Sequence, residues 1–342
     1  MLSLKVPLKE AEKWKKYLVE TKNFNNKYRF KKDDSFIYFP ILRRFEVLRG
    51  DISFVDMSFE ESKNSGDLKT NLINFLSKEE LSILKASHDI IGTIAILEIP
   101  KELEHKEKFI AETLLRINKN IKTVLKKADA HEGVFRTQKM KYLAGINTTE
   151  TLYKENNVSL LVDVEKVYFS IRLSNERKRI AGLVKPGEDI LVMFSGAAPY
   201  PVVLSKNTPA KHILGIEINP DGHKYGLENI KINKCKNVEL ICGDVHVIVP
   251  ELNNKNIRYD RIIMPLPKTA DEFLDDALML SKKSTVIHFY DFLEESNFDE
   301  AKIKISEACK RNNRDYRIIN IVKCGQHAPR VFRICVDFEI IN

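Results

Sequence analysis

The sequence lacks the features that mark several large classes of protein. Within its 342 residues, no uninterrupted apolar run approaches the roughly 18 residues of a membrane-spanning helix, so we expect no membrane domain. The opening stretch MLSLKVPLKE reaches charged side chains without an apolar signal-peptide core, so secretion is not expected. No internal repeat stands out, and a hydrophobic content of 43% predicts a globular protein of two or three domains.

Cysteine is scarce and forms no recognisable pattern. The five cysteines are an odd number, and no two of them form a C-x-x-C pair. Cysteines of this kind are typical of a reduced, cytoplasmic protein and predict neither a disulfide framework nor a zinc site. The eight histidines contain no close pair of ligands, and we expect no bound metal. His212, His223 and His288 are each expected to be structural or exposed.

Strand and helix signals alternate between residues 186 and 268. Segments with helical spacing, such as Gly222–Asn233, lie between short apolar runs that favour strands. The runs are Ile190–Phe194, Ile213–Ile216, Val238–Ile241 and Arg261–Met264. This alternation predicts an α/β fold with a parallel sheet. In such sheets ligands bind beyond the carboxyl ends of the strands.

The turns after these strands favour an adenosine-containing ligand. Glu217 ends the second strand, where a carboxylate can accept hydrogen bonds from both ribose hydroxyls. Asp244 follows the third strand, where it could meet the adenine amine. The first turn, Gly196–Tyr200, lacks the later glycines of G-x-G-x-x-G that a dinucleotide pyrophosphate requires. The pattern therefore favours S-adenosylmethionine, which has no phosphates, over NAD or a nucleotide; a Rossmann-like sheet with an empty crevice is the alternative.

Positive charge and aromatic residues point to RNA. Lys and Arg outnumber Asp and Glu by 56 to 48, which fits a polyanionic partner. Basic and aromatic side chains interleave between residues 131 and 180, a composition suited to phosphate neutralisation and base stacking. An ordinary basic surface is the alternative for this stretch.

The flanking regions complete the domain plan. Before the expected linker at Glu61–Asp67 we expect a strand at Leu2–Val6, a helix at Pro7–Thr21, and strands at Phe30 and Phe36–Pro40. Between the linker and residue 166 we expect a helix at Leu68–Ala86, a strand at Ile90–Ile99 with a turn at Gly92, and a helix at Lys106–Ile117. After residue 268 we expect helices at Ala270–Ser281 and Asn297–Arg311, a strand at Ser284–Tyr290, and an edge hairpin of Arg317–Val322 and Val331–Ile340.

Several motifs, taken in order, resemble those of the archaeal and eukaryotic tRNA (guanine-37-N1)-methyltransferases. They are KVYFSIRLSNER, VMFSGAAPYP, GIEINP, GDV, MPLPK and HAPR followed by VF. The resemblance implies a class I methyltransferase Rossmann-like domain at 166–342, behind two smaller RNA-binding domains at 1–66 and 67–165. It implies methylation of N1 of the guanosine 3′ of the anticodon, and we expect the protein to be cytoplasmic and monomeric. The cofactor would be S-adenosylmethionine, and the partner tRNA, contacted at its anticodon loop and outer corner.

The resemblance also implies roles for individual residues. Arg136 of an FR motif, Glu176 of an ER motif and Arg172 fall on the family's catalytic positions. A carboxylate such as Glu176 could take the N1 proton, and Arg136 could stabilise negative charge on guanine O6. The implied cofactor-binding residues are Tyr168, Phe194, Gly196, Pro199, Glu217, Ile218, Asp244, Val245 and Pro265.

Three positions depart from the family pattern. Val192 and Ala198 replace an aspartate and a glycine of the D-M-F-A-G-V-G-P-F turn, and Pro265 replaces the asparagine of N-L-P. A proline cannot donate the hydrogen bond that an asparagine could give to the target base. Two other activities therefore stay open. One is transfer of the 3-amino-3-carboxypropyl group of the same cofactor during wyosine synthesis, and the other is RNA binding without catalysis.

Overall fold

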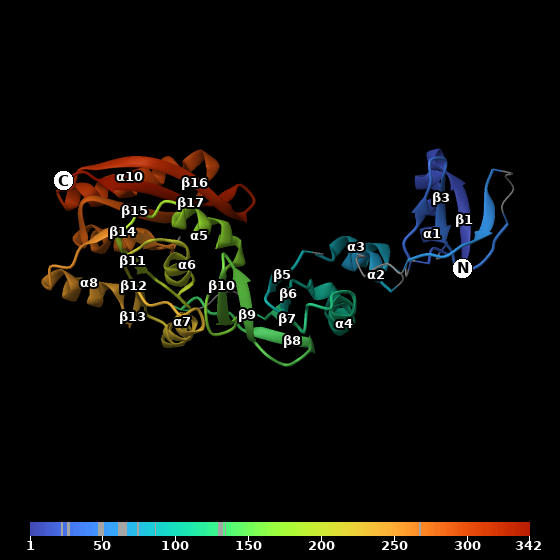
Figure 1. The fold of residues 1–342 in the computed structure, drawn as a ribbon, viewed down its shortest axis with the longest axis horizontal. Helices are drawn as coiled ribbons and strands as arrows, with labels where there is room; N and C mark the ends of the chain where they lie inside the picture. Colours follow the sequence, from blue (N-terminus) through green and yellow to red (C-terminus); the bar gives the residue numbers. More distant parts are fainter. Residues whose placement is uncertain are drawn as a thin grey trace. The chain divides into compact units, whose positions relative to one another are not determined.

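The computed structural model describes the chain except residues 22, 26–27, 47–50, 61–66, 74, 86, 129–132, 134 and 267, with backbone alone at 16, 19 and 20. The expected linker lies almost wholly outside the described residues. The chain forms two compact units (Figure 1). The first comprises Met1–Ser87, Glu98–Lys122 and Leu143–Gly145, and the second His88–Leu97, Thr123–Tyr142 and Ile146–Asn342. The three-domain division stays a prediction; residues 146–165 belong to the second unit.

An antiparallel four-stranded sheet opens the first unit, in the order β2-β3-β1-β4. Its elements are β1 (Leu2–Pro7), α1 (Ala11–Glu20), β2 (Lys31–Lys32), β3 (Phe36–Pro40) and β4 (Ser53–Asp56). Leu4, Leu18 and Phe39 are buried between helix and sheet because apolar residues alternate along β1 and β3. The predicted strand at Phe30 begins one residue later, and β4 lies where the sequence predicts no strand.

The predicted helix at Leu68–Ala86 is wrong, because two short helices, α2 (Leu68–Leu72) and α3 (Lys78–Ile83), occupy this stretch. Ser77 begins the second helix with a capping box: its Oγ accepts from the Glu80 amide at 3.2 Å, and the Glu80 carboxylate accepts from the Ser77 amide at 2.7 Å. The predicted helix further along is confirmed as α4 (Glu107–Ile117).

A seven-stranded sheet forms the centre of the second unit, in the order β13-β12-β11-β14-β15-β17-β16. The strands follow one another in this order from bottom to top in Figure 1. They are β11 (Asp189–Met193), β12 (His212–Glu217), β13 (Val238–Cys242), β14 (Tyr259–Met264), β15 (Ser281–Glu294), β16 (Tyr316–Ala328) and β17 (Val331–Ile340). The first five are parallel to one another, and β17 runs antiparallel to both of its neighbours, β15 and β16. The predicted parallel α/β sheet with a C-terminal hairpin is confirmed.

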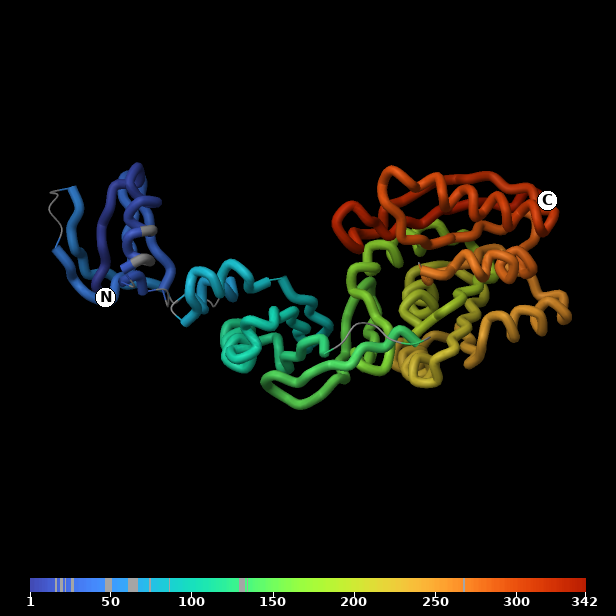
Figure 2. Tube along the Cα trace, turned by 180° about the vertical axis from the view of Figure 1, so that it is seen from behind, coloured from blue at the N-terminus to red at the C-terminus, as the bar shows by residue number. Residues whose placement is uncertain are grey.

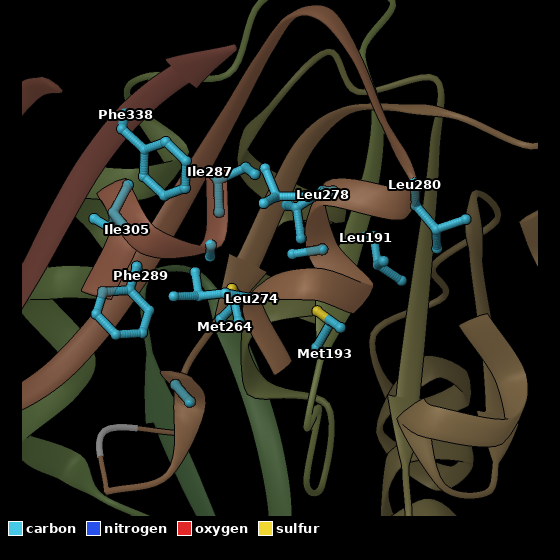
Figure 3. Close-up of a cluster of buried hydrophobic side chains, with 14 of the residues drawn as sticks. Leu191, Met193, Met264, Leu274, Leu278, Leu280, Ile287, Phe289, Ile305 and Phe338 are labelled. Carbon is cyan, nitrogen blue, oxygen red and sulfur yellow. The ribbon is translucent and has the colours of Figure 1, made fainter. Parts of the chain in front are cut away.

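Helices between the strands bury the sheet. They are α5 (Ser174–Ala181), α6 (Pro199–Asn207), α7 (Pro220–Ile232), α8 (Val245–Asn254), α9 (Leu274–Met279) and α10 (Asp299–Arg311). On one face, Leu274 and Leu278 of α9 and Ile305 of α10 pack against Phe289 of β15 and Phe338 of β17 (Figure 3). Every one of these side chains is at most 1% exposed, so the strands that carry the candidate site rest on a rigid core.

Smaller strands flank this sheet. They are β5 (Asp89–Ile91), β6 (Ile94–Leu97), β7 (Thr123–Lys127), β8 (Met140–Gly145), β9 (Glu150–Glu155) and β10 (Val158–Asp163). The strand expected at Ile90–Ile99 is the hairpin β5–β6, which turns at Gly92 with φ of +56°. The hairpin β9–β10 is fastened to α7, since Asn229 and Asn233 accept hydrogen bonds from β10 amides at 2.6 and 2.9 Å. Figure 2 follows the C-terminal hairpin along the outer edge of the second unit.

Candidate active site at the carboxyl ends of the strands

The turn after β11 has an unusual backbone. Phe194, Gly196 and Ala198 adopt φ angles of 58°, 55° and 60°, in the left-handed region that residues with a Cβ seldom enter. The turn then leads directly into α6, which starts at Pro199, a residue suited to the first helical position. A Cβ at Gly196 would lie 3.7 Å from the carbonyl oxygen of Tyr168. The structure therefore brings Tyr168 and the predicted cofactor turn together.

Glu217 is tied to the same turn. Its carboxylate accepts hydrogen bonds from the amides of Gly196 at 2.5 Å and Asn219 at 2.8 Å. The side chain is buried, and burial raises its pKa above the ordinary value, although the backbone amides oppose the shift. No guanidinium or ammonium group hydrogen-bonds to this carboxylate among the described residues. Donors from a bound ligand, such as ribose hydroxyls, would complete its solvation.

Other predicted cofactor residues lie in the turns after β11, β12 and β13. Asp244 caps α8, since its Oδ1 accepts from the His246 amide at 2.9 Å, and Val245 behind it is buried. Ile218 is 37% exposed and follows Glu217 directly. Phe194 contacts Phe273 edge to face with ring centroids 4.7 Å apart. His246 stacks on the ring of Phe273, with centroids 4.2 Å apart. Aromatic rings thus line the side of the site that Asp244 borders.

Glu176 lies on α5 and is 4% exposed. Arg179 binds it through two hydrogen bonds, from Nε at 2.8 Å and from a terminal nitrogen at 2.7 Å. The Tyr290 hydroxyl donates a third at 2.7 Å. Burial raises the pKa of Glu176, but the hydrogen bonds from Arg179 and Tyr290 outweigh it, so the net shift is downward. The carboxylate is therefore ionised near neutral pH.

Glu176 is one end of a buried ionic network that runs through Arg179, Asp337, His288 and Arg261 to Glu188. Asp337 accepts from Arg179 at 2.6 and 3.2 Å and from Nδ1 of His288 at 2.6 Å. On the far side of the imidazole, Arg261 approaches Nε2 at 2.7 Å. Arg261 also forms a two-point pair with Glu188 at 2.7 and 2.8 Å. A guanidinium can only donate, so Nε2 accepts and His288 is neutral, with its proton on Nδ1.

A second cluster gathers around Tyr168. Arg333 of β17 donates to the Tyr168 hydroxyl at 3.0 Å, and its guanidinium lies 5.1 Å from the ring centre of Phe292. The exposed His327, from the HAPR motif, stacks on Phe292 at 4.0 Å. Burial lowers the pKa of Arg136, Tyr168 opposes this shift, and Arg333 adds to it, which brings Arg136 into the same cluster. The predicted residues Arg136 and Tyr168 are therefore neighbours.

Arg172 and Pro265 fit their predicted roles less directly. The guanidinium of Arg172 is engaged with Asp89 on β5, at 3.0 and 3.2 Å, and not with Glu176. Pro265 sits in a tight turn after β14, in which the Leu266 amide donates to the Met264 carbonyl at 2.7 Å. Proline brings no donor to that turn, as the sequence predicts.

Sequence reasoning missed most of the ionic network. Arg261, His288 and Asp337 lie on largely apolar strands, next to apolar residues in the runs RIIM, VIHFY and CVDFE. A single polar residue on a buried strand requires a buried partner. That signal could have linked the three residues, although not in their order. His288 was expected to be structural or exposed, and it is fully buried.

His288, Cys335 and Asp337 form the one group of metal-ligand type found among the described residues, with donor atoms within 4.8 Å of one another. Arg261, Arg179 and the Cys335 thiol already bind this imidazole and carboxylate. Two guanidinium groups beside the cluster would repel a cation, so it does not fit a metal.

No helix in the described parts of the chain is both long and apolar enough to cross a membrane.

Three family models match successive parts of the chain. The tRNA methyltransferase 5 N-terminal domain matches residues 3–48, the TYW2 N-terminal domain residues 68–149, and the TRM5/TYW2 methyltransferase domain residues 151–319. The tRNA (guanine(37)-N(1))-methyltransferase Trm5b of Pyrococcus abyssi is 35% identical over 99% of both chains. A tRNA(Phe) (4-demethylwyosine(37)-C(7)) aminocarboxypropyltransferase of Methanocaldococcus jannaschii is 32% identical over 72% of this chain and 95% of its own length.

Solved structures of these proteins are similar throughout. The crystal structure of Pyrococcus abyssi Trm5b matches with a TM-score of 0.74 at 35% identity, and a complex of aTrm5 with tRNALeu with 0.73 at 29%. Methanocaldococcus jannaschii Trm5 in complex with adenosine matches with 0.66 at 28%. Each of the three comparisons covers 100% of both chains.

Proposed function

Because the chain belongs to the TRM5/TYW2 family of tRNA-modifying transferases, we propose that it transfers the methyl group of S-adenosylmethionine to N1 of guanosine 37 in tRNA. The observation that carries the proposal is similarity over the whole chain to a guanine-37-N1 methyltransferase, together with the buried carboxylate of Glu217 at the predicted cofactor turn. The complex of a similar enzyme with tRNALeu supports tRNA as the partner.

The cofactor would lie at the carboxyl ends of β11 to β14. The related structure with adenosine supports an adenosine-containing cofactor. We assign the ribose hydroxyls to Glu217, whose carboxylate accepts only from backbone amides among the residues that the structure describes. Asp244 would face the adenine, and Phe194 would pack beside it. The left-handed turn at Gly196 would let the backbone approach the methionine part of the cofactor.

The transfer itself forms a bond from guanine N1 to the methyl carbon as the bond from carbon to sulfur breaks. The N1 proton must leave, and we assign it to the carboxylate of Glu176, which is ionised near neutral pH. Negative charge that develops on guanine O6 would be stabilised by Arg136. Arg333 and His327 would border the target nucleotide on the side of Arg136, and Tyr168 would contact the cofactor. Holding N1 in line with sulfur and carbon supplies the remaining acceleration.

A second candidate is transfer of the 3-amino-3-carboxypropyl group to a wyosine precursor. It is favoured by the similarity to an aminocarboxypropyltransferase and by Pro265, which cannot give the donor of the usual asparagine. The presence of both Arg136 and Glu176 favours methyl transfer.

Mass mapping distinguishes the two candidates. Unmodified tRNA is incubated with the protein and S-adenosylmethionine, then cut by nuclease, and the fragments are weighed. We expect one added methyl on the guanosine 3′ of the anticodon. An added aminocarboxypropyl group on tRNA carrying the wyosine precursor would establish the second activity instead. Absence of either product, with tRNA binding intact, would leave an RNA-binding protein.

A further inference from the structure

The proton acceptor that we assign is not free. Both oxygens of the Glu176 carboxylate accept hydrogen bonds from Arg179, and one also accepts from Tyr290. A carboxylate bound at two points by a guanidinium is a weaker base than a free one, because the cation stabilises the charged form. Groups that draw Arg179 away from Glu176 would therefore make the Glu176 carboxylate a stronger base.

Asp337 is the feature that competes for the same cation. Arg179 donates from Nη1 to Asp337 at 2.6 Å, and its Nη2 donates both to Asp337 at 3.2 Å and to Glu176 at 2.7 Å. One guanidinium thus serves two buried carboxylates, which are 3% and 4% exposed. The network as a whole holds three carboxylates against two guanidinium groups, with His288 neutral. Arg179 therefore compensates only part of the charge on Glu176.

We propose that Arg179 and Asp337 are positioning residues: Asp337 shares the guanidinium of Arg179 with Glu176 and so sets both the orientation of the Glu176 carboxylate and its attraction for a proton. His288 and Arg261 hold Asp337 from behind and keep it from turning away. The proposal rests on the proposed function, since it matters only if Glu176 accepts the N1 proton.

Other groups that face Glu176 do not share this role. Tyr290 of β15, Tyr200 of α6, Cys324 of β16 and Cys335 of β17 are all buried, and burial raises the pKa of each. All four are neutral near pH 7. Arg177, the next residue along the chain, is paired with Glu155 at 2.5 and 2.6 Å. Arg333, whose charge acts on Cys324, donates to the Tyr168 hydroxyl. The ionic balance of Glu176 thus depends on Arg179 and Asp337.

The test is the pH profile of single-turnover methyl transfer at saturating cofactor and tRNA. In Arg179→Gln the cation is gone, and we expect the acid limb to move up by about 1–3 pH units. In Asp337→Asn the whole guanidinium is left to Glu176. We expect the acid limb to move down and the rate to fall by about tenfold or more, because a weaker base transfers the proton less readily. Arg179→Lys keeps the charge and should keep the wild-type limb.

A matched control lies on the same strand. Glu339→Gln removes the carboxylate that pairs with the exposed Arg317 at 2.6 Å, two residues from Asp337, and should change neither rate nor profile. If a single variant fails to fold, the double variant Arg179→Gln with Asp337→Asn removes both charges of the pair at once. It should fold and show the upward shift of Arg179→Gln.

The outcomes separate this proposal from the proposed function. If the variants fold and lose rate equally at every pH, the network is merely structural and the proposal is wrong. If Glu176→Gln keeps the wild-type rate, Glu176 is not the base, and the proposal fails with that assignment. If wild-type protein adds no methyl to guanosine 37, the function itself is overturned.

Discussion

Two buried carboxylates of the second unit are solvated in opposite ways. Glu176 receives hydrogen bonds from a guanidinium and a phenol, and its pKa is lowered. Within the described parts of the chain, Glu217 receives them only from backbone amides, and burial raises its pKa. The first region is complete without a ligand, whereas the second lacks donors that a ligand could bring. The difference fits the two roles that we propose, a proton acceptor at Glu176 and a cofactor-binding carboxylate at Glu217.

The largest effect is expected when a guanidinium group is removed from the ionic network that ends at Glu176. Arg261→Met leaves Glu188 buried without its partner and removes the donor to His288. We expect a loss of about 3–5 kcal/mol in the free energy of unfolding, measured in urea. The exposed pair of Arg317 and Glu339 is the control, and Arg317→Met should cost less than about 1 kcal/mol. Equal losses would show that the network contributes nothing beyond a surface pair.

A substitution at Glu217 is expected to weaken the binding of S-adenosylmethionine. Glu217→Gln replaces the acceptor that we assign to the ribose hydroxyls, and hydrogen bonds to a charged group contribute about 1.5–3 kcal/mol. We therefore expect the Kd for S-adenosylmethionine to rise by roughly 10- to 100-fold in calorimetry. The matched variant Glu176→Gln should leave this Kd unchanged. Weaker cofactor binding in Glu176→Gln alone would reverse the assignment of the two carboxylates.

The pH dependence of cofactor binding sharpens the same contrast. Because the pKa of Glu217 is raised in the folded protein, ionisation of this carboxyl lowers the free energy of unfolding. The loss is absent at low pH and appears as pH rises through the folded-state pKa. A cofactor that needs the ionised carboxylate must then bind more weakly as pH falls through that pKa, in a window above the ordinary value of 4.5. Calorimetry over this range should show the decline in wild-type protein and a flat profile in Glu217→Gln. A decline that persists in the variant would assign it to another group.

The smallest expected effect comes from the backbone of the cofactor turn. Gly196→Ala and Gly187→Ala both place a Cβ at positive φ, +55° and +80°, and each should cost roughly 1–2 kcal/mol of stability. Only the Cβ at Gly196 would meet another group, the Tyr168 carbonyl at 3.7 Å. We therefore expect weaker cofactor binding in Gly196→Ala alone. Equal affinities in the two variants would remove this turn from the cofactor site.

The region of Glu217 was the easier of the two to predict from sequence. Strand runs with short turns placed Glu217, Gly196 and Asp244 at one edge of a parallel sheet, and the structure has them there. This works because a parallel sheet brings the carboxyl ends of its strands together, whatever the helices between them.

The helix boundary near Ser77 was missed, although the capping box Ser77–Glu80 stands in the sequence.

The partners of Glu176 could not be predicted in the same way. Arg179 lies one helical turn further along α5, but Tyr290 and Asp337 come from strands more than a hundred residues away. Their meeting depends on the antiparallel return of β17 beside β15, which pairs Asp337 with His288. Strand order of this kind is set by the packing of the whole sheet, and no local pattern reports it.

The most direct test of the account is single-turnover methyl transfer to tRNA by Glu176→Gln and Glu217→Gln, each at saturating S-adenosylmethionine. We predict that Glu176→Gln loses about 10²–10⁴-fold in rate, as expected for a lost general base. We predict that Glu217→Gln returns close to the wild-type rate once its weaker cofactor binding is overcome. A fast Glu176→Gln together with a Glu217→Gln that stays slow at saturation would contradict it.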